Sequence, residues 1–346
     1  MARPPGFDTE FVYELCVCRW AELAWPPGVD ETTTADNVAL DSGFDGETTE
    51  SDVTHLVARQ IGTKRRRWDT VVVEADPAGL RQRAAFGETE LDSDLLHIVR
   101  HAPAEWAWYR DALPEPDYPW RYVREAIHRA SDRDILHTRR AGNRIEIKRI
   151  APYPDWLDSL VAIENKPDLD SSAASRLGEQ LSHDVSVGLA DAVWVATERT
   201  GRTVEPALLE ALPVEAGILT TDFDGGVDRD SAEVVWHPTG LTPTHDAATR
   251  ERRRLELAER AYGRGWRSYH ETMRPDCRFF ALRRHGRALL SWCEAKGCHQ
   301  SAAVCAGSCG QFEPEPPAWR TRGWPIEGGP GAGLRRLLAD RADRER

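Results

Sequence analysis

Glu164 and Lys166, two positions apart, are the residues in this chain whose types and spacing are best suited to chemistry. A carboxylate can hold a divalent cation, and an ammonium group beside it can act on a water molecule or a phosphate. Lysine is rare here, because only four of the 45 basic residues are lysine and the rest are arginine. A retained lysine therefore indicates a place where a compact ammonium group does what a guanidinium fork cannot.

The apolar run 160–163 leads directly into Glu164 and predicts a buried β-strand. On a strand, Glu164 and Lys166 project from one face. The same Glu-x-Lys spacing begins at Glu146 and at Glu294. Residues 144–149 alternate charged and apolar side chains, which indicates an exposed ion pair on a hairpin, and Glu294 lies among cysteines without a strand pattern. Context therefore favours Glu164.

The acidity of the chain does not exclude a nucleic-acid partner. The 57 acidic and 45 basic residues give a formal charge of −12, and the scarcity of lysine resembles the composition of proteins from extreme halophiles. In molar salt the Debye length is about 3 Å, so local patches decide binding. The 346 residues allow a large core and two modules. The sequence contains neither a long apolar run nor an apolar signal core, so we expect a cytoplasmic protein with no membrane partner; its oligomeric state stays open.

The periodicity of apolar residues predicts an alternating series of helices and strands. Helices are expected over residues 11–25, 120–130, 170–189, 204–212 and 247–262, and strands over 55–61, 68–74, 159–163, 192–197, 217–220 and 234–237. Residues 28–52 indicate a disordered acidic insert. Residues 136–150 indicate a β-hairpin, which with the preceding helix resembles a winged helix. Glutamate and arginine interleave over 247–262, so we expect that helix to be solvated and self-paired.

Without its central insertion, this series resembles the αβββαβ core of the PD-(D/E)xK superfamily, the restriction-endonuclease-like and RecB-like nucleases. The resemblance implies an α/β fold with a mixed sheet flanked by helices. It divides the chain into a first half of the core (1–76), a winged-helix-like insertion (77–152), a second half of the core (153–245), and a charged helix with a Cys-rich tail (246–346). The sequence also resembles an uncharacterised group of haloarchaeal proteins.

The resemblance implies a metal site of two carboxylates with a lysine beside it. In such nucleases an aspartate on the second strand and the glutamate of Glu-x-Lys hold Mg²⁺ or Mn²⁺, so Asp69 and Glu164 are the expected ligands. Lys166 then orients and activates water. We favour Asp69 because an aspartate in a β-branched run is unusual on propensity. Asp155 and Asp158 remain alternatives.

Two supporting residues also follow from the resemblance. Glu14 on the first helix matches an acidic residue that many members place near the metal. Gln180 matches the glutamine of RecB-type nucleases, although the tyrosine expected four residues later is Asp184 here. The basic run 64–67, between the first two strands, is either a phosphate-binding patch or a solvated turn.

Seven cysteines in an expected cytoplasmic chain indicate metal binding before disulfides. Four thiolates could hold structural Zn²⁺, or one N-terminal and three C-terminal cysteines could hold a [4Fe–4S] cluster. The second arrangement resembles the iron–sulfur nucleases related to RecB. The candidate ligands are Cys18, Cys277, Cys293, Cys298, Cys305 and Cys309, with Cys16 and His299 as substitutes.

The sequence as a whole predicts a Mg²⁺-dependent nuclease that hydrolyses phosphodiester bonds of DNA. The alternative is a non-catalytic nucleic-acid-binding or scaffold protein on a degenerate nuclease fold, stabilised by zinc or an iron–sulfur cluster.

Overall fold

The computed structural model describes residues 9–28, 53–63, 66–116, 118–168, 171–199, 211–224, 226–241, 246–267, 274–285, 288–301, 304–305 and 309–314. Several predictions fall outside these residues: almost all of the acidic insert, Lys64 and Arg65, most of the helix expected over 204–212, and the tail beyond residue 314.

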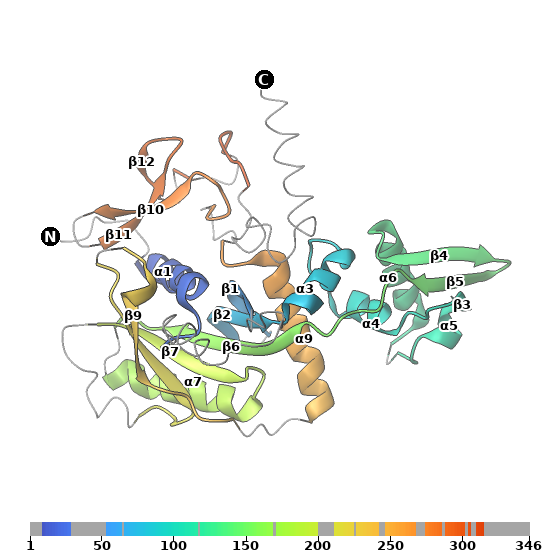
Figure 1. Cartoon of the computed structure of the whole chain (residues 1–346), viewed down its shortest axis with the longest axis horizontal. Helices are drawn as coiled ribbons and strands as arrows, with labels where there is room; N and C mark the ends of the chain where they lie inside the picture. The colour runs from blue at the N-terminus through green and yellow to red at the C-terminus, as the bar shows by residue number, and fades with distance from the viewer. Residues whose placement is uncertain are drawn as a thin grey trace, which may run out of the picture.

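The described residues form a mixed α/β fold (Figure 1). The helices are α1 (Thr9–Ala24), α3 (Pro77–Arg83), α4 (Ser93–His101), α5 (Tyr109–Ala112), α6 (Trp120–Asp132), α7 (Ser171–Val187) and α9 (Ala247–Arg264), with the 3-10 turns η1 (Ala84–Phe86) and η2 (Arg229–Ser231). The strands are β1 (Thr54–Gly62), β2 (Arg67–Ala75), β3 (Ala107–Trp108), β4 (Leu136–Ala141), β5 (Arg144–Arg149), β6 (Leu157–Asn165), β7 (Ala192–Glu198), β8 (Ala216–Thr221), β9 (Ala232–Trp236), β10 (Phe280–His285), β11 (Ala288–Cys293) and β12 (Cys298–His299). The predicted helices and strands that lie within the described residues are confirmed, with shifts of a few residues at their ends.

A six-stranded mixed sheet, in the order β1-β2-β6-β7-β8-β9, forms the centre of the molecule. β1, β2 and β6 are antiparallel neighbours, β6, β7 and β8 run parallel, and β9 closes the edge antiparallel to β8. With the segment between β2 and β6 set aside, the order along the chain is α1, β1, β2, β6, α7, β7. A parallel pair needs a crossover connection, and α7 supplies it between β6 and β7.

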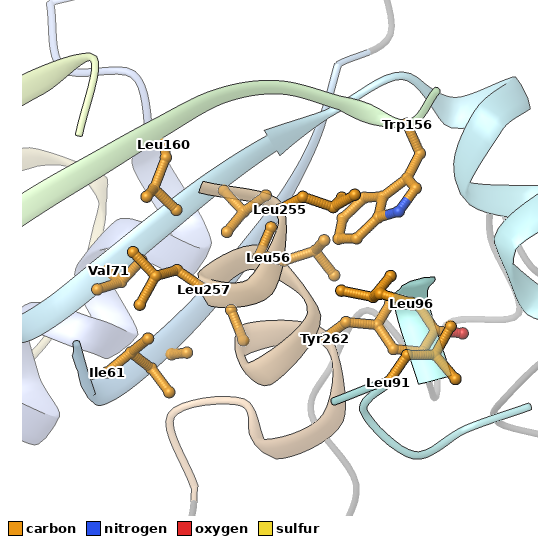
Figure 2. Packing of buried hydrophobic residues seen from close by; sticks show 14 of the residues in the cluster. Leu56, Ile61, Val71, Leu91, Leu96, Trp156, Leu160, Leu255, Leu257 and Tyr262 are labelled. Carbon is orange, nitrogen blue, oxygen red and sulfur yellow. The ribbon is translucent and has the colours of Figure 1, made fainter. Parts of the chain in front are cut away.

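The two faces of this sheet are covered by different segments. Along β6, Leu160 and Ala162 belong to the cluster that includes residues of α7 and α9, whereas Val161 and Ile163 belong to the cluster that includes α1. This alternation follows from the two-residue period of a strand. Figure 2 shows strand residues such as Leu160 packed against the α9 side chains of that first cluster.

The expectation of a solvated, self-paired helix over 247–262 is wrong. Helix α9 buries Leu255, Leu257, Ala258, Ala261 and Tyr262 in the core. Full burial of one such leucine is worth roughly 1.5–3 kcal/mol, which outweighs the few tenths that a surface ion pair along a helix contributes. The interleaved charges conceal this apolar stripe in the sequence.

The insertion between β2 and β6 stands at one end of the sheet (Figure 1). It contains α3, α4, α5, α6 and a three-stranded sheet in the order β3-β5-β4. The predicted hairpin is confirmed as β4 and β5, and Gly142 at its tip has φ of +60°, a conformation that favours glycine. The chain leaves the main sheet at Ala75 and re-enters it at Leu157.

The Cys-rich segment forms a small antiparallel sheet, β10-β11-β12, that no strand pattern in the sequence indicated. It lies near α1 (Figure 1), and Cys277, Phe280 and Cys305 join the buried cluster of that helix. None of the described helices combines the length and the apolar character needed to cross a membrane.

Candidate functional site

The candidate site lies where β2 and β6 part. Their pairing ends at Thr70 and Ile163, so the next opposed positions are Asp69 and Glu164. Beyond that point the Asn165 amide donates to Oδ2 of Asp69 at 3.0 Å, and the carboxylate replaces a backbone acceptor of the sheet. Two carboxylates from neighbouring strands therefore meet at one end of the sheet.

The alternatives to Asp69 lie at the other end of β6. Asp158 is the second residue of that strand, and Asp155 precedes it. Burial, followed by the charges of Asp76 and Asp155, raises the pKa of Asp158. Because a strand rises about 3.3 Å per residue, Asp158 lies roughly 20 Å along β6 from Glu164. Asp69 is therefore the aspartate opposed to Glu164.

Gln60 connects Glu14 to these carboxylates. Its amide nitrogen donates to Oε1 of Glu14 at 3.1 Å and to Oδ1 of Asp69 at 3.3 Å. Gln60 lies in β1 with φ of +55°, although the register with β2 is the same on either side of it. Such a conformation in a residue other than glycine costs about 1–3 kcal/mol and occurs preferentially at functional sites. No motif in the sequence pointed to Gln60.

Arg66 is the cation closest to Glu164 and was missed as a site residue. Its Nη2 donates to Oε1 of Glu164 at 2.6 Å. The same guanidinium grips Asp184, with Nε at 3.0 Å from both oxygens and Nη2 at 2.8 Å from Oδ2. All three side chains are largely buried, with 12%, 3% and 2% exposure for Arg66, Glu164 and Asp184. Asp184, which departs from the RecB-type pattern, is thus the partner of an arginine from the predicted basic run.

The cluster carries more negative than positive charge. Burial, and next the charge of Asp69, raises the pKa of Glu164 to about 7, against the opposing effect of Arg66. Burial likewise raises the pKa of Glu14 to about 7, although Arg59 donates to it at 3.3 Å. Burial alone would lower the pKa of Arg66, but Asp184 and Glu164 raise it. Four carboxyl groups (Glu14, Asp69, Glu164, Asp184) therefore share two guanidinium groups, a condition typical of functional sites.

Lys166 and Gln180 are not drawn into this cluster. Nζ of Lys166 lies 3.8 Å from Oε1 of the exposed Glu10 on α1, and the Lys166 side chain is 32% exposed. Gln180 is exposed on α7, one turn before Asp184. The structure thus gathers Glu14, Asp69 and Glu164, leaves Lys166 at the rim, and gives Gln180 no contact with these carboxylates among the described residues.

A cleft of about 640 Å³ opens beside Arg66 and Asp184. Its walls also carry Arg253 and Arg260 from α9 and His183 from α7. Arg260 donates to the Gly62 carbonyl at 2.7 Å, which ties α9 to the β1–β2 connection. The cleft gives solvent and small anions a route to the guanidinium that holds Glu164.

The donor chemistry of Asp69 and Glu164 suits Mg²⁺ or Mn²⁺. Magnesium is usually held by one or two carboxylates, with water and substrate phosphate completing the shell. In the part of the chain that the structure describes, no three His, Cys, Asp or Glu side chains are grouped to hold a metal ion. Asp69 and Glu164 therefore offer two carboxylates, and a divalent cation at this place stays a prediction.

The cysteines do not form the predicted four-thiolate arrangement within the described residues. Cys293 and Cys298 are opposed on β11 and β12, and Cys305 accepts from the Arg274 amide at 3.3 Å. Cys18 is buried under the sheet with its sulfur 3.3 Å from Oγ1 of Thr70, and burial raises the pKa of its thiol. A neutral core thiol is a poor metal ligand. Zinc or an iron–sulfur cluster at these cysteines stays a prediction.

Residues 56–314 match the family model DUF5787, which is described as a family of unknown function. No curated protein and no solved structure matches the chain.

Proposed function

Since the chain belongs to DUF5787, whose description assigns no activity, we propose from its own residues that it is a metal-dependent nuclease acting on DNA. The observation that carries this proposal is the opposition of Asp69 and Glu164 where β2 and β6 part. Hydrolysis of a phosphodiester needs carboxylates that can hold a divalent cation at a position open to a polyanion.

The order and direction of the core elements support the proposal. α1, β1, β2, β6, α7 and β7 follow one another with an antiparallel β1-β2-β6 sheet and a parallel β6-β7 pair. This arrangement resembles the αβββαβ core of restriction-endonuclease-like nucleases, with 77–156 as the insertion. In that resemblance Asp69 lies on the second core strand and Glu164 on the third. This is a likeness of fold, so the function rests on the carboxylates themselves.

Each side chain has a distinct proposed part. Asp69 and Glu164 would hold Mg²⁺ or Mn²⁺, which when bound neutralises phosphate charge and lowers the pKa of bound water. Glu164, whose pKa burial raises to about 7 in the metal-free protein, would release its proton as the cation binds. The Lys166 side chain is about a third exposed, and its 3.8 Å contact with an exposed glutamate is weak enough to exchange for a phosphate. Gln60 and Glu14 hold Asp69 in place.

One observation favours the second candidate, a nucleic-acid-binding protein without catalysis. Arg66 already compensates Glu164 at 2.6 Å, and Lys166 faces Glu10 rather than the carboxylates. A guanidinium retained on Glu164 would keep a cation out. The two candidates differ in whether Arg66 gives up this contact when divalent cation and DNA are present.

Cleavage of labelled DNA with Mn²⁺ in high salt separates the candidates. We expect Asp69→Asn, Glu164→Gln and Lys166→Ala each to lower the rate at least about 100-fold, because general acid–base and electrostatic groups contribute at this scale. Lys148→Ala is the matched control, since Lys148 also stands two residues after a glutamate on a strand and should leave the rate unchanged. Equal rates for the wild type and Lys166→Ala would overturn the proposal, provided that circular dichroism shows both folded.

A further inference from the structure

A second concentration of charge lies on the insertion, away from the carboxylates. A groove of about 880 Å³ runs between α6 and the β4–β5 hairpin. Its charged lining consists of Arg121, Arg124, Arg140, Arg144, His128 and Glu125. On a chain of formal charge −12, four arginines facing one glutamate form a local patch of the opposite sign.

The arginines of this groove form no ion pairs with the described acidic residues. Among the described residues, none of the four makes a salt bridge, and all four are exposed. Their neighbours on the same elements behave differently, because Arg129 pairs with Asp92 and Arg139 pairs with Glu146. Arg121 donates to the Tyr122 hydroxyl at 2.7 Å and Arg144 lies 4.6 Å from the Trp108 ring centroid, but neither contact neutralises a charge. The four arginines are therefore available to an external anion.

Helix α6 presents these groups through its amphipathic pattern. It buries Val123, Ala126, Ile127 and Ala130 against the insertion's own core, so Arg121, Arg124 and His128 face outward. The hairpin adds Arg140 and Arg144 on either side of its tip at Gly142. The two elements therefore place cations on both walls of the groove.

Exposed aromatic rings accompany the cations. Tyr122 lines the groove and is 44% exposed, with the Arg121 guanidinium 4.7 Å from its ring centroid. Tyr118, 37% exposed, lies edge-on to Tyr122 at 6.4 Å. Exposed aromatics beside a cationic groove are the combination that binds single-stranded nucleic acid, because phosphates lie on the cations and bases stack on the rings. Duplex DNA keeps its bases stacked internally and has no use for Tyr122.

We propose that the groove between α6 and the β4–β5 hairpin binds single-stranded DNA and anchors the strand that the carboxylates act on. This rests on the proposed function for the fate of the strand, but the binding itself does not. The insertion joins the sheet at Leu157, whereas Glu164 is at the opposite end of β6. Seven residue steps of a strand span roughly 23 Å. A DNA strand must therefore be several nucleotides long to touch both places.

The test measures binding of the full chain to a fluorescently labelled 30-nucleotide DNA strand by anisotropy, without divalent metal and over a range of salt. The variant carries Arg124→Ser, Arg140→Ser and Arg144→Ser together. Its matched control carries Arg199→Ser, Arg278→Ser and Arg283→Ser, which removes the same charge from exposed arginines that are paired with glutamates elsewhere.

We expect the groove variant to bind at least tenfold more weakly and its salt dependence to fall by about two log units per log unit of salt, because each lost contact with a single strand contributes about 0.7. The control variant should bind within about twofold of the wild type. Tyr122→Ala should weaken binding about fivefold or more through lost stacking. An equal loss in the two triple variants, or tighter binding of duplex DNA or of single-stranded RNA, overturns the proposal.

Failure of the groove and failure of the nuclease are distinguishable. Glu164→Gln should bind the strand as the wild type does. If neither the wild type nor any variant cleaves DNA but binding still depends on the groove arginines, the proposed nuclease function is wrong and the proposed binding groove is supported. If the groove variant cleaves a 30-nucleotide strand at the wild-type rate under subsaturating conditions, the groove does not anchor the substrate, whereas the proposed nuclease function is supported. Support would be a slower rate on that strand with an unchanged rate on a two-nucleotide strand, which is too short to reach the groove from the carboxylates.

Discussion

Two buried arginine–carboxylate clusters in this protein differ in whether their charges balance. Arg83 donates to both oxygens of Glu259 at 2.5 and 2.6 Å, and neither side chain is exposed. Glu259 also accepts from the Tyr153 hydroxyl at 2.6 Å and the Leu91 amide at 2.9 Å. The Arg83 guanidinium lies 4.2 Å from the ring centroid of Tyr262. One cation therefore meets one anion, and both are fully hydrogen-bonded.

The Arg66 cluster has the opposite character. Arg66 donates to both Glu164 and Asp184, and the charge of Asp69 adds to burial in raising the pKa of Glu164 and of Glu14. A balanced, buried ion pair does not rearrange when solvent or substrate enters. The pair of Arg83 and Glu259 therefore has a structural part and joins the insertion to α9. A cluster with surplus carboxylates is stabilised by any cation or proton that binds there. Both clusters are buried, so burial does not distinguish a structural ion pair from a candidate functional site, whereas the balance of charge does.

Removing the cation from the closed pair should produce the largest effect. We expect Arg83→Leu to lower the free energy of unfolding by about 3–5 kcal/mol, since Glu259 is left buried and uncompensated. Urea denaturation near pH 7 measures this. When both variants are measured by urea denaturation at pH 5, Arg66→Leu should lower the free energy of unfolding clearly less than Arg83→Leu, because Glu164 can take up a proton in place of the lost guanidinium. Equal losses for the two variants at that pH would contradict the comparison.

The pH dependence of stability should come next in size. The pKa of Glu164 is about 7 in the folded protein and has an ordinary value of 4.5, so the unfolded chain releases this proton first as pH rises. Stability from this group is therefore lost between about pH 4.5 and 7, by on the order of 3 kcal/mol. The side chain in Glu164→Gln stays neutral, so the free energy of unfolding of this variant should rise relative to that of the wild type by the same amount between about pH 4.5 and 7. Glu146→Gln, a surface control, should follow the wild type, and parallel profiles for Glu164→Gln would refute the shift.

Stabilisation by a divalent cation should be the smallest effect. Mn²⁺ at 100 times its Kd adds about 2.7 kcal/mol to the folded state, which a thermal melt detects as a rise in Tm. We expect Asp69→Asn to lose this rise and Glu259→Gln to keep it despite a lower starting Tm. A rise that survives in Asp69→Asn would place the cation elsewhere.

Much of the core was predictable because short-range patterns specify it. The β-branched run around Val71 and the apolar run before Glu164 predicted the strands β2 and β6. Asp69 stood out because a carboxylate is unusual in such a run.

Other features were not predictable because they depend on long-range contacts. Arg66 was visible only as part of a basic run, and its direction is set by Asp184, 118 positions away. Gln60 acquires its role through Glu14 and Asp69, which come from two other elements. The burial of α9 was hidden because its charges were weighed by number and not by face.

The sequence by itself determined the helices and strands around the central sheet, the α/β class, and the choice of Asp69 and Glu164 as the carboxylates of interest. Only the tertiary structure decided that Arg66 turns inward, that Lys166 lies at the rim, and that the groove arginines form no salt bridge with any described residue. The physical reason is range. Backbone periodicity and propensity act within a few residues, whereas a charge acquires its pKa and its partner from whatever the fold brings within a few ångströms of it.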